Sequence, residues 1–110
     1  MTIEFGDFEK VDVRVGTVTG VEDFPRARKP AYRLTVDFGG EIGERRTSAQ
    51  VTTYEKDELV GMQVVAVVNF EPKNIAGFMS EILVLGVPGP EGEVVLLSPT
   101  RPGPDGGRMF

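Results

Sequence analysis

Lys73, Phe78 and Met79 are the side chains whose types and spacing best suit binding in this sequence. They fall within one stretch, Asn69–Gly86, that also holds a proline and a glycine between two apolar runs. A cation beside an exposed aromatic ring can bind a nucleic acid, and the ring with a flexible methionine can hold the apolar side chains of an extended peptide. These residues therefore predict a binding loop at the lip of a sheet. The alternative is a hairpin connection whose phenylalanine belongs to the core.

The residue types argue against an enzyme. The chain contains no cysteine and no histidine, which removes disulfides, thiolate metal sites and the commonest general base. Lys73 and Tyr54 are the side chains that could transfer a proton, and nothing in the sequence pairs either with a partner. We expect no catalytic residue, no metal site and no cofactor.

The net charge and the distribution of the charges favour different functions. The net charge of −5 disfavours a general nucleic-acid binder, because Lys and Arg supply most of that affinity. The distribution of the charges can override their total. Arg26–Arg33 carries four cations and no acid, and Arg45 and Arg46 add two more. The sequence predicts either an acidic body with one basic face or a solvated cationic run without a partner.

Alternating side chains predict strands over most of the chain. Valine or threonine occupies every odd position from Val11 to Val21, which indicates a long, half-buried strand. Gly16 and Gly20 interrupt it and are expected to serve a bulge or bend. Ala31–Phe38 alternates in the same way. Further strands are expected at Glu44–Val51, Met62–Phe70, Ser80–Val87 and Glu93–Leu97.

A short helix is predicted within Thr52–Gly61, with Thr52 or Thr53 as its cap, Tyr54 and Leu59 inward and Gly61 at its end. This order predicts an all-β fold: a five-stranded Greek-key OB barrel with one short helix between strands three and four, plus terminal extensions. The length predicts a single domain, 1–110, with its core at about 8–97 and extensions at 1–7 and 98–110. Pro99–Phe110 is expected to be a solvated tail or to dock Met109 and Phe110 on a partner subunit.

The same sequence bears on assembly and location. No apolar run reaches the roughly 20 residues of a membrane span, and MTIEFGDFEK lacks the features of a signal peptide. We therefore expect a cytoplasmic protein without membrane insertion. A small barrel with Ile3 and Phe5 at one end and Met109 and Phe110 at the other predicts a homodimer.

Four segments in collinear order carry a family resemblance: FEKVDVRVG (Phe8–Gly16), AYRLTVDFG (Ala31–Gly39), SAQVT (Ser48–Thr52) and VVAVVNFEPKNIAGFMSEILVLG (Val64–Gly86). They resemble the tRNA-binding domain family, which includes the C-terminal domain of some methionyl-tRNA synthetases. The resemblance implies an OB-fold homodimer whose terminal segments build the interface. It also implies either an export-related chaperone for unfolded or precursor polypeptides, with the protein-export machinery as a partner, or a protein that binds tRNA by its shape.

The resemblance carries over Arg28, Lys29, Arg33, Asn69, Lys73, Phe78 and Ser80 as site residues, and residue type alone suggests the others. Polypeptide binding is expected at Phe78, Met79, Ile75 and Asn69. Binding of tRNA is expected at Arg28, Lys29, Arg33, Arg45, Ser48, Lys73 and Ser80. Asn74 stands where tRNA-binding relatives tend to have a second cation, and Ile82-Leu83 stands where they tend to have Gly-Met. These departures favour the chaperone.

Overall fold

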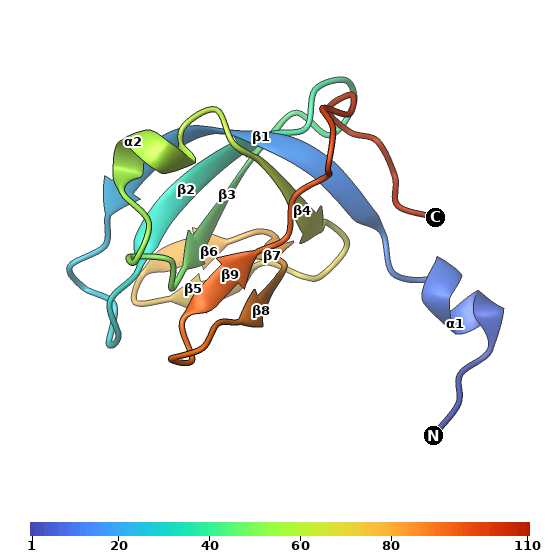
Figure 1. Ribbon diagram of the computed structural model, residues 1–110, viewed down its shortest axis with the longest axis horizontal. Coiled ribbons are helices and arrows are strands. Elements are labelled where there is room, and N and C mark those ends of the chain that lie inside the picture. The colour runs from blue at the N-terminus through green and yellow to red at the C-terminus, as the bar shows by residue number, and fades with distance from the viewer.

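The computed structural model describes residues 1–110 and has an antiparallel five-stranded sheet at its centre. The strand order is β3-β2-β1-β4-β7, and the sheet curves into a nearly closed barrel (Figure 1). Its strands are β1 (Val13–Asp23), β2 (Tyr32–Asp37), β3 (Glu44–Ala49), β4 (Gln63–Val67) and β7 (Leu83–Val84). Two hairpins accompany the barrel: β5 (Lys73–Ile75) with β6 (Phe78–Ser80), and β8 (Gly86–Pro88) with β9 (Val94–Leu96). With helix α2 (Lys56–Leu59) between β3 and β4, this confirms the predicted OB-type barrel.

The core lies inside this barrel and draws on every strand of the sheet except β3 and β7. β2 supplies it as its alternation predicts, because Leu34, Val36 and the adjoining Phe38 are almost fully buried. The buried cluster is Val18, Leu34, Val36, Phe38, Val51, Leu59, Val64, Ala66 and Ile82.

β1 differs from the expected alternation. Val18 lies in the core while Thr19 is exposed, so the odd positions do not share one buried face along the whole strand. Gly16 lies where the strand crosses the core, and a Cβ atom there would be 2.8 Å from the ring of Phe38. The register also shifts between Val18 and Gly20. Both glycines therefore have the structural role that the sequence predicted, and the bend they allow changes the face that points inward.

Helix α2 begins later than predicted. Its N-cap is Glu55, which forms a capping box with Glu58, and the Glu55 N–H donates to the Glu58 carboxylate at 3.2 Å. The expected caps, Thr52 and Thr53, lie instead in the preceding turn. That turn is needed to bring the chain from β3 to the helix. Leu59 is fully buried as predicted.

A second helix, α1 (Phe5–Glu9), precedes the barrel and was not predicted from the sequence. It buries no residue and extends away from the barrel in Figure 1. The rings of Phe5 and Phe8 lie 5.9 Å apart on it. Neither this helix nor α2 has the length and apolar character that a membrane crossing requires.

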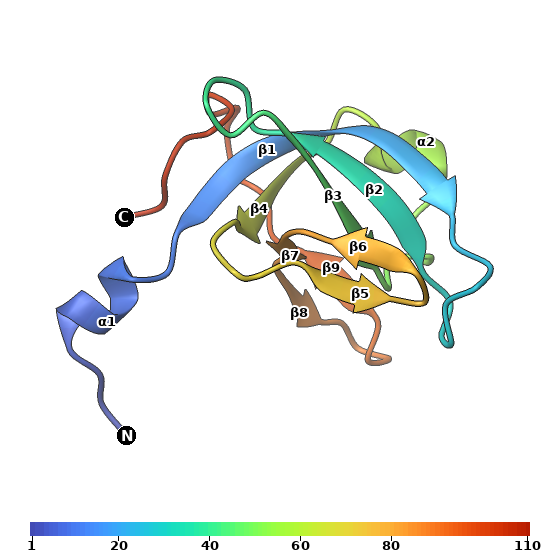
Figure 2. The same cartoon turned by 180° about the vertical axis from the view of Figure 1, so that it is seen from behind.

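The C-terminal segment runs back along the start of β1 (Figures 1 and 2). Val15 exchanges backbone hydrogen bonds with Gly106 and Gly107, and the Met109 N–H donates to the Val13 carbonyl at 2.8 Å. Residues 103–109 therefore do not form the solvated tail that was one expectation. The side chains of Met109 and Phe110 remain exposed.

Candidate functional site

The stretch that suggested binding forms a hairpin in place of the predicted loop. Ala76 and Gly77 both have positive φ, 51° and 86°, which is the conformation of a two-residue type I′ turn. Ile75 pairs with Phe78 across it. Cross-strand partners share a face, so Ile75 and Phe78 lie on one side of the hairpin and Met79 lies on the other.

A groove opens beside this hairpin and consists of two adjoining cavities of about 990 and 420 Å³. Ser48, Ile75 and Leu83 line both cavities. The larger cavity is mostly apolar and is lined by Ala27, Arg28, Lys29, Ala31, Ser48, Ala49, Gln50, Val51, Ile75, Ala76, Leu83, Val84, Val94 and Leu96. The smaller one is lined by Ser48, Phe70, Glu71, Lys73, Ile75, Ser80, Glu81, Ile82 and Leu83. We call the two together the groove.

The charges of the groove are unevenly placed. Arg28 and Lys29 are exposed at the larger cavity, which has no acidic lining residue. Lys73 shares the smaller cavity with Glu71 and Glu81. The larger cavity of the groove is therefore mostly apolar with two cations, and the smaller one carries charges of both signs, so the larger cavity suits an extended apolar segment with a negative group.

Phe78 lies in a separate cluster of aromatic and basic side chains. Its half-buried ring packs edge-on against the buried Phe24 with a centroid distance of 5.5 Å. The guanidinium carbon of Arg46 lies 4.9 Å from the centroid of Phe78, and that of Arg33 lies 6.0 Å from it. Arg46 also forms an ion pair with Glu22 at 3.0 Å. The cluster places two cations on aromatic rings at the surface, outside the lining of the groove.

Of the adjacent pair Arg45 and Arg46, the structure brings Arg46 to this cluster, and Arg45, the residue expected from the sequence to bind tRNA, lies apart from it. Arg45 pairs with Val36, whose side chain is fully buried, and its Nε donates to the Ile42 carbonyl at 3.2 Å. Arg46 points to the other face, toward Phe78. Strand parity could have identified it, because Arg46 pairs with Thr35, which shares a face with Arg33 two residues earlier.

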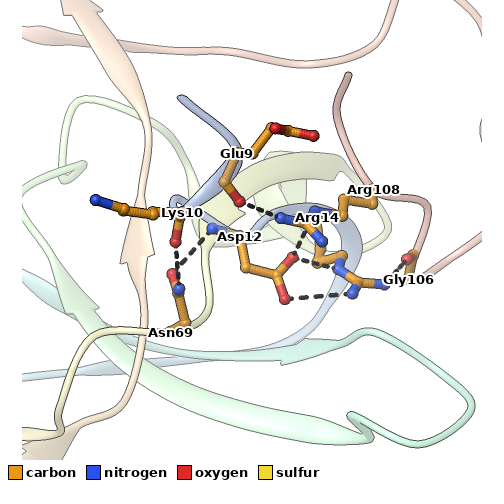
Figure 3. A network of polar contacts seen from close by, with 7 residues as sticks. All are labelled: Glu9, Lys10, Asp12, Arg14, Asn69, Gly106 and Arg108. Atoms are coloured by element: carbon orange, nitrogen blue, oxygen red, sulfur yellow. Dashed lines mark hydrogen bonds and ion pairs between the residues drawn. The ribbon is translucent and has the colours of Figure 1, made fainter. Parts of the chain in front are cut away.

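Ser80 and Asn69 make structural hydrogen bonds. The hydroxyl oxygens of Ser80 and Thr47 lie 2.8 Å apart where both residues are buried. Asn69 receives a hydrogen bond from the Asp12 N–H at 3.0 Å and donates to the Lys10 carbonyl at 2.8 Å, and so fastens the chain that follows α1 (Figure 3). Asn69 does not line either cavity of the groove.

Charged residues surround this fastening point (Figure 3). The Asp12 carboxylate lies 2.6 Å from Arg14 Nε and 3.5 Å from Arg108 Nε. The hydrogen bond from Arg14, aided by the charges of both arginines, lowers the pKa of Asp12 below its ordinary value. Arg108 also donates to the Glu9 carbonyl at 2.7 Å. The network joins the two terminal segments to β1. No group of three acidic side chains here or elsewhere is placed to hold a metal ion.

Comparison with known proteins identifies the relatives of this chain. A family model described as "Putative tRNA binding domain" matches residues 13–108. Two crystal structures of CsaA chaperone proteins are similar over nearly the whole chain. The one from Picrophilus torridus is 49% identical, has a TM-score of 0.94, and is matched over 99% of this chain and 100% of its own. The one from Bacillus anthracis is 50% identical, has a TM-score of 0.92, and is matched over 100% of both chains.

A methionine–tRNA ligase from Salinibacter ruber is 44% identical over 94 residues, which cover 84% of this chain and 13% of the ligase. The chain thus spans about one seventh of the length of the curated relatives it matches.

Proposed function

Because this chain belongs to the family of putative tRNA-binding domains, we propose a function from within that family: a non-catalytic, homodimeric chaperone that binds unfolded or precursor polypeptides in the groove. The groove itself carries the proposal. Its larger cavity has a volume of about 990 Å³ and a mostly apolar lining that includes the cations Arg28 and Lys29. The similarity to two proteins described as CsaA chaperones, at 49% and 50% identity over nearly the full chain, supports it.

The proposal includes assembly and location. Terminal apolar side chains remain uncovered, with Ile3 at 67%, Phe5 at 72% and Phe110 at 108% of full exposure, and a two-fold partner would bury them. A chaperone for precursor polypeptides would act in the cytoplasm and pass its clients to the protein-export machinery. The chain 1–110 is proposed to be one domain. Light scattering at the mass of a monomer would contradict the dimer.

The test of polypeptide binding uses two matched leucine and valine substitutions. Leu83 lines the groove and is 49% exposed, and Val87 is 48% exposed outside it. With reduced, carboxymethylated α-lactalbumin as the unfolded client, Leu83→Asp should raise the Kd by at least about tenfold, because it places a charge on the apolar surface. Val87→Asp should change it by less than about twofold. Equal effects, or no binding by the unchanged protein, would contradict the proposal.

Binding of tRNA is the second candidate, and the cluster of Arg33, Arg46 and Phe78 favours it. Guanidinium planes exposed beside an aromatic ring can stack on unpaired bases or contact phosphates. Arg28, Lys29, Lys73 and Ser48 would add contacts from the groove.

The test of this candidate compares Arg46→Gln with Arg101→Gln, since Arg101 is an exposed arginine in the C-terminal segment. Binding of bulk tRNA would be measured by gel shift at several salt concentrations. Arg46→Gln should reduce the slope of log K against log salt by about one unit, and Arg101→Gln should leave it unchanged. Absence of a shift at low salt would contradict tRNA binding.

A further inference from the structure

β3 is an edge strand of the sheet, so one of its sides has no neighbouring strand. Pairing with β2 is antiparallel, with Tyr32 opposite Ala49, and the Phe38 N–H donates to the Gly43 carbonyl. In this ladder, alternate residues turn their N–H and C=O groups away from the partner strand. Counting from Gly43, the residues of β3 and its continuation that point outward are Glu44, Arg46, Ser48 and Gln50, and the last three lie toward the groove.

From Arg46 to Gln50, the outward-pointing main-chain groups have progressively fewer hydrogen-bond partners. The Arg46 carbonyl accepts from the Glu81 N–H at 2.8 Å, and the Arg46 N–H donates to the Glu81 carboxylate at 2.9 Å. The Ser48 N–H has only the Ser80 hydroxyl, at 3.4 Å. The main-chain N–H and C=O of Gln50 have no hydrogen-bond partner in the chain. The barrel is therefore closed at Arg46 and open at Gln50.

The opening coincides with the groove. Gln50 is exposed and lines the larger cavity, and Leu83 and Val84 line it from β7, the opposite edge strand of the sheet. An uncovered strand edge is a template for another strand, and extended peptides are recognised in this way by several domain families. Resting on the proposed chaperone function, we propose that the client enters the groove as an added β-strand paired with the main chain of Gln50.

The groove also determines which segments fit. In an added strand, alternate side chains would point toward the apolar lining at Val51 and Leu96, and the others toward solvent. Arg28 and Lys29 lie at the same cavity without an ion-pair partner within the chain. The preferred client is therefore an extended segment of alternating aliphatic and polar residues with a carboxylate near Arg28 and Lys29.

The first test removes the N–H of the edge with a proline. Gln50→Pro deletes this donor, and the matched Gln50→Ala deletes the side chain but keeps the donor. The probe is a fluorescent peptide of alternating valine and threonine that ends in two aspartates. Gln50→Pro should raise its Kd by about fivefold, as expected for one lost backbone hydrogen bond, and Gln50→Ala by less than about twofold. Circular dichroism and thermal melting would show whether the proline variant is folded.

The second test needs no substitution. Amide hydrogen exchange at Gln50, followed by NMR, should slow at least about tenfold when the peptide saturates the unchanged protein. The amide of Thr53, which also lacks a partner but lies outside the groove, should not change.

The outcomes separate this inference from the proposed function. If Leu83→Asp weakens binding while Gln50 exchange is unaffected and the two Gln50 variants bind alike, strand addition is wrong and the chaperone groove stands. If the unchanged protein binds neither peptide nor unfolded α-lactalbumin, both proposals fail. Protection of Gln50 in the free protein that disappears on dilution would show a second copy at this edge and would overturn the inference.

Discussion

The start of β1 and the residues that follow β3 both lack a neighbouring strand of the sheet on one side, and only the start of β1 is covered. β2 pairs with β1 from Thr17 onward, so the first residues of β1 have β4 on one side alone. The C-terminal segment lies along the other side and satisfies Val13 and Val15. At the end of β3, by contrast, the main chain of Gln50 has no partner.

The difference shows that this chain can cover an edge when a segment of its own is available. Uncovered edges favour unwanted pairing with other chains, and the covered edge of β1 is further secured by Asp12, Arg14 and Arg108. The open edge of β3 has apolar walls and unpaired cations instead. A closed edge contributes stability, whereas an open edge in a groove is available to a ligand.

The largest expected effect comes from uncovering the edge of β1. Ending the chain after Pro102 removes three backbone hydrogen bonds to β1 and two between Gln63 and Gly103. At about 1 kcal/mol for each net hydrogen bond, the free energy of unfolding should fall by about 3–5 kcal/mol in urea titrations. Replacing Arg101, an exposed residue of the same segment without an ion pair, by alanine should change it by less than about 0.5 kcal/mol. Equal losses would show that the covering segment contributes nothing.

A smaller effect is expected where the barrel closes beside the open edge. The buried Thr47 hydroxyl lies 2.8 Å from the Ser80 hydroxyl and donates to the Ile82 carbonyl at 2.9 Å. Thr47→Val keeps the shape but removes the hydroxyl that pairs with Ser80 and with the Ile82 carbonyl, so unfolding should be easier by about 2 kcal/mol. Thr35→Val, on the neighbouring strand, alters a half-buried threonine whose hydroxyl makes no hydrogen bond and should cost less than about 0.5 kcal/mol. A cost for Thr47→Val as small as that of the control would mean that the closure does not depend on this hydroxyl.

Local patterns in the sequence predicted the barrel well. Period-two alternation placed Leu34, Val36 and Phe38 in the core, and the interrupting glycine at position 16 marked the crossing point of β1. These features depend on side-chain periodicity and on the space available to a Cβ atom, which a sequence displays directly.

The candidate site was harder to predict because it depends on contacts between distant segments. The separation of Phe78 from Met79 follows from their adjacent places on β6, a short strand formed by the Ala76–Gly77 turn, and Ala76 is an unusual residue at positive φ. The stacking of Arg46 on Phe78 joins residues 32 positions apart. The role of the C-terminal segment could not be seen at all, since a run rich in proline and glycine has no periodicity to indicate its partner strand.

The third and smallest effect concerns the charges at the covered edge. Asp12→Asn removes the ion pairs with Arg14 and Arg108, which are partly exposed, and should lower the free energy of unfolding by about 1 kcal/mol at pH 7. Asp57→Asn, at an exposed carboxylate without an ion pair, is the control for the loss of one charge.

The pH dependence of this effect tests its cause. The folded state lowers the pKa of Asp12 from its ordinary value of 3.8, so the folded protein releases this proton more readily than the unfolded chain does. The stabilisation is therefore complete above the unfolded pKa and disappears as the pH falls through the lower, folded pKa. The difference in stability between the unchanged protein and Asp12→Asn should be constant from pH 7 to about 5 and should shrink below about 4. A difference that stays the same down to pH 3 would show that the arginines do not hold the covered edge through this carboxylate, and that backbone pairing alone distinguishes it from the open edge of β3.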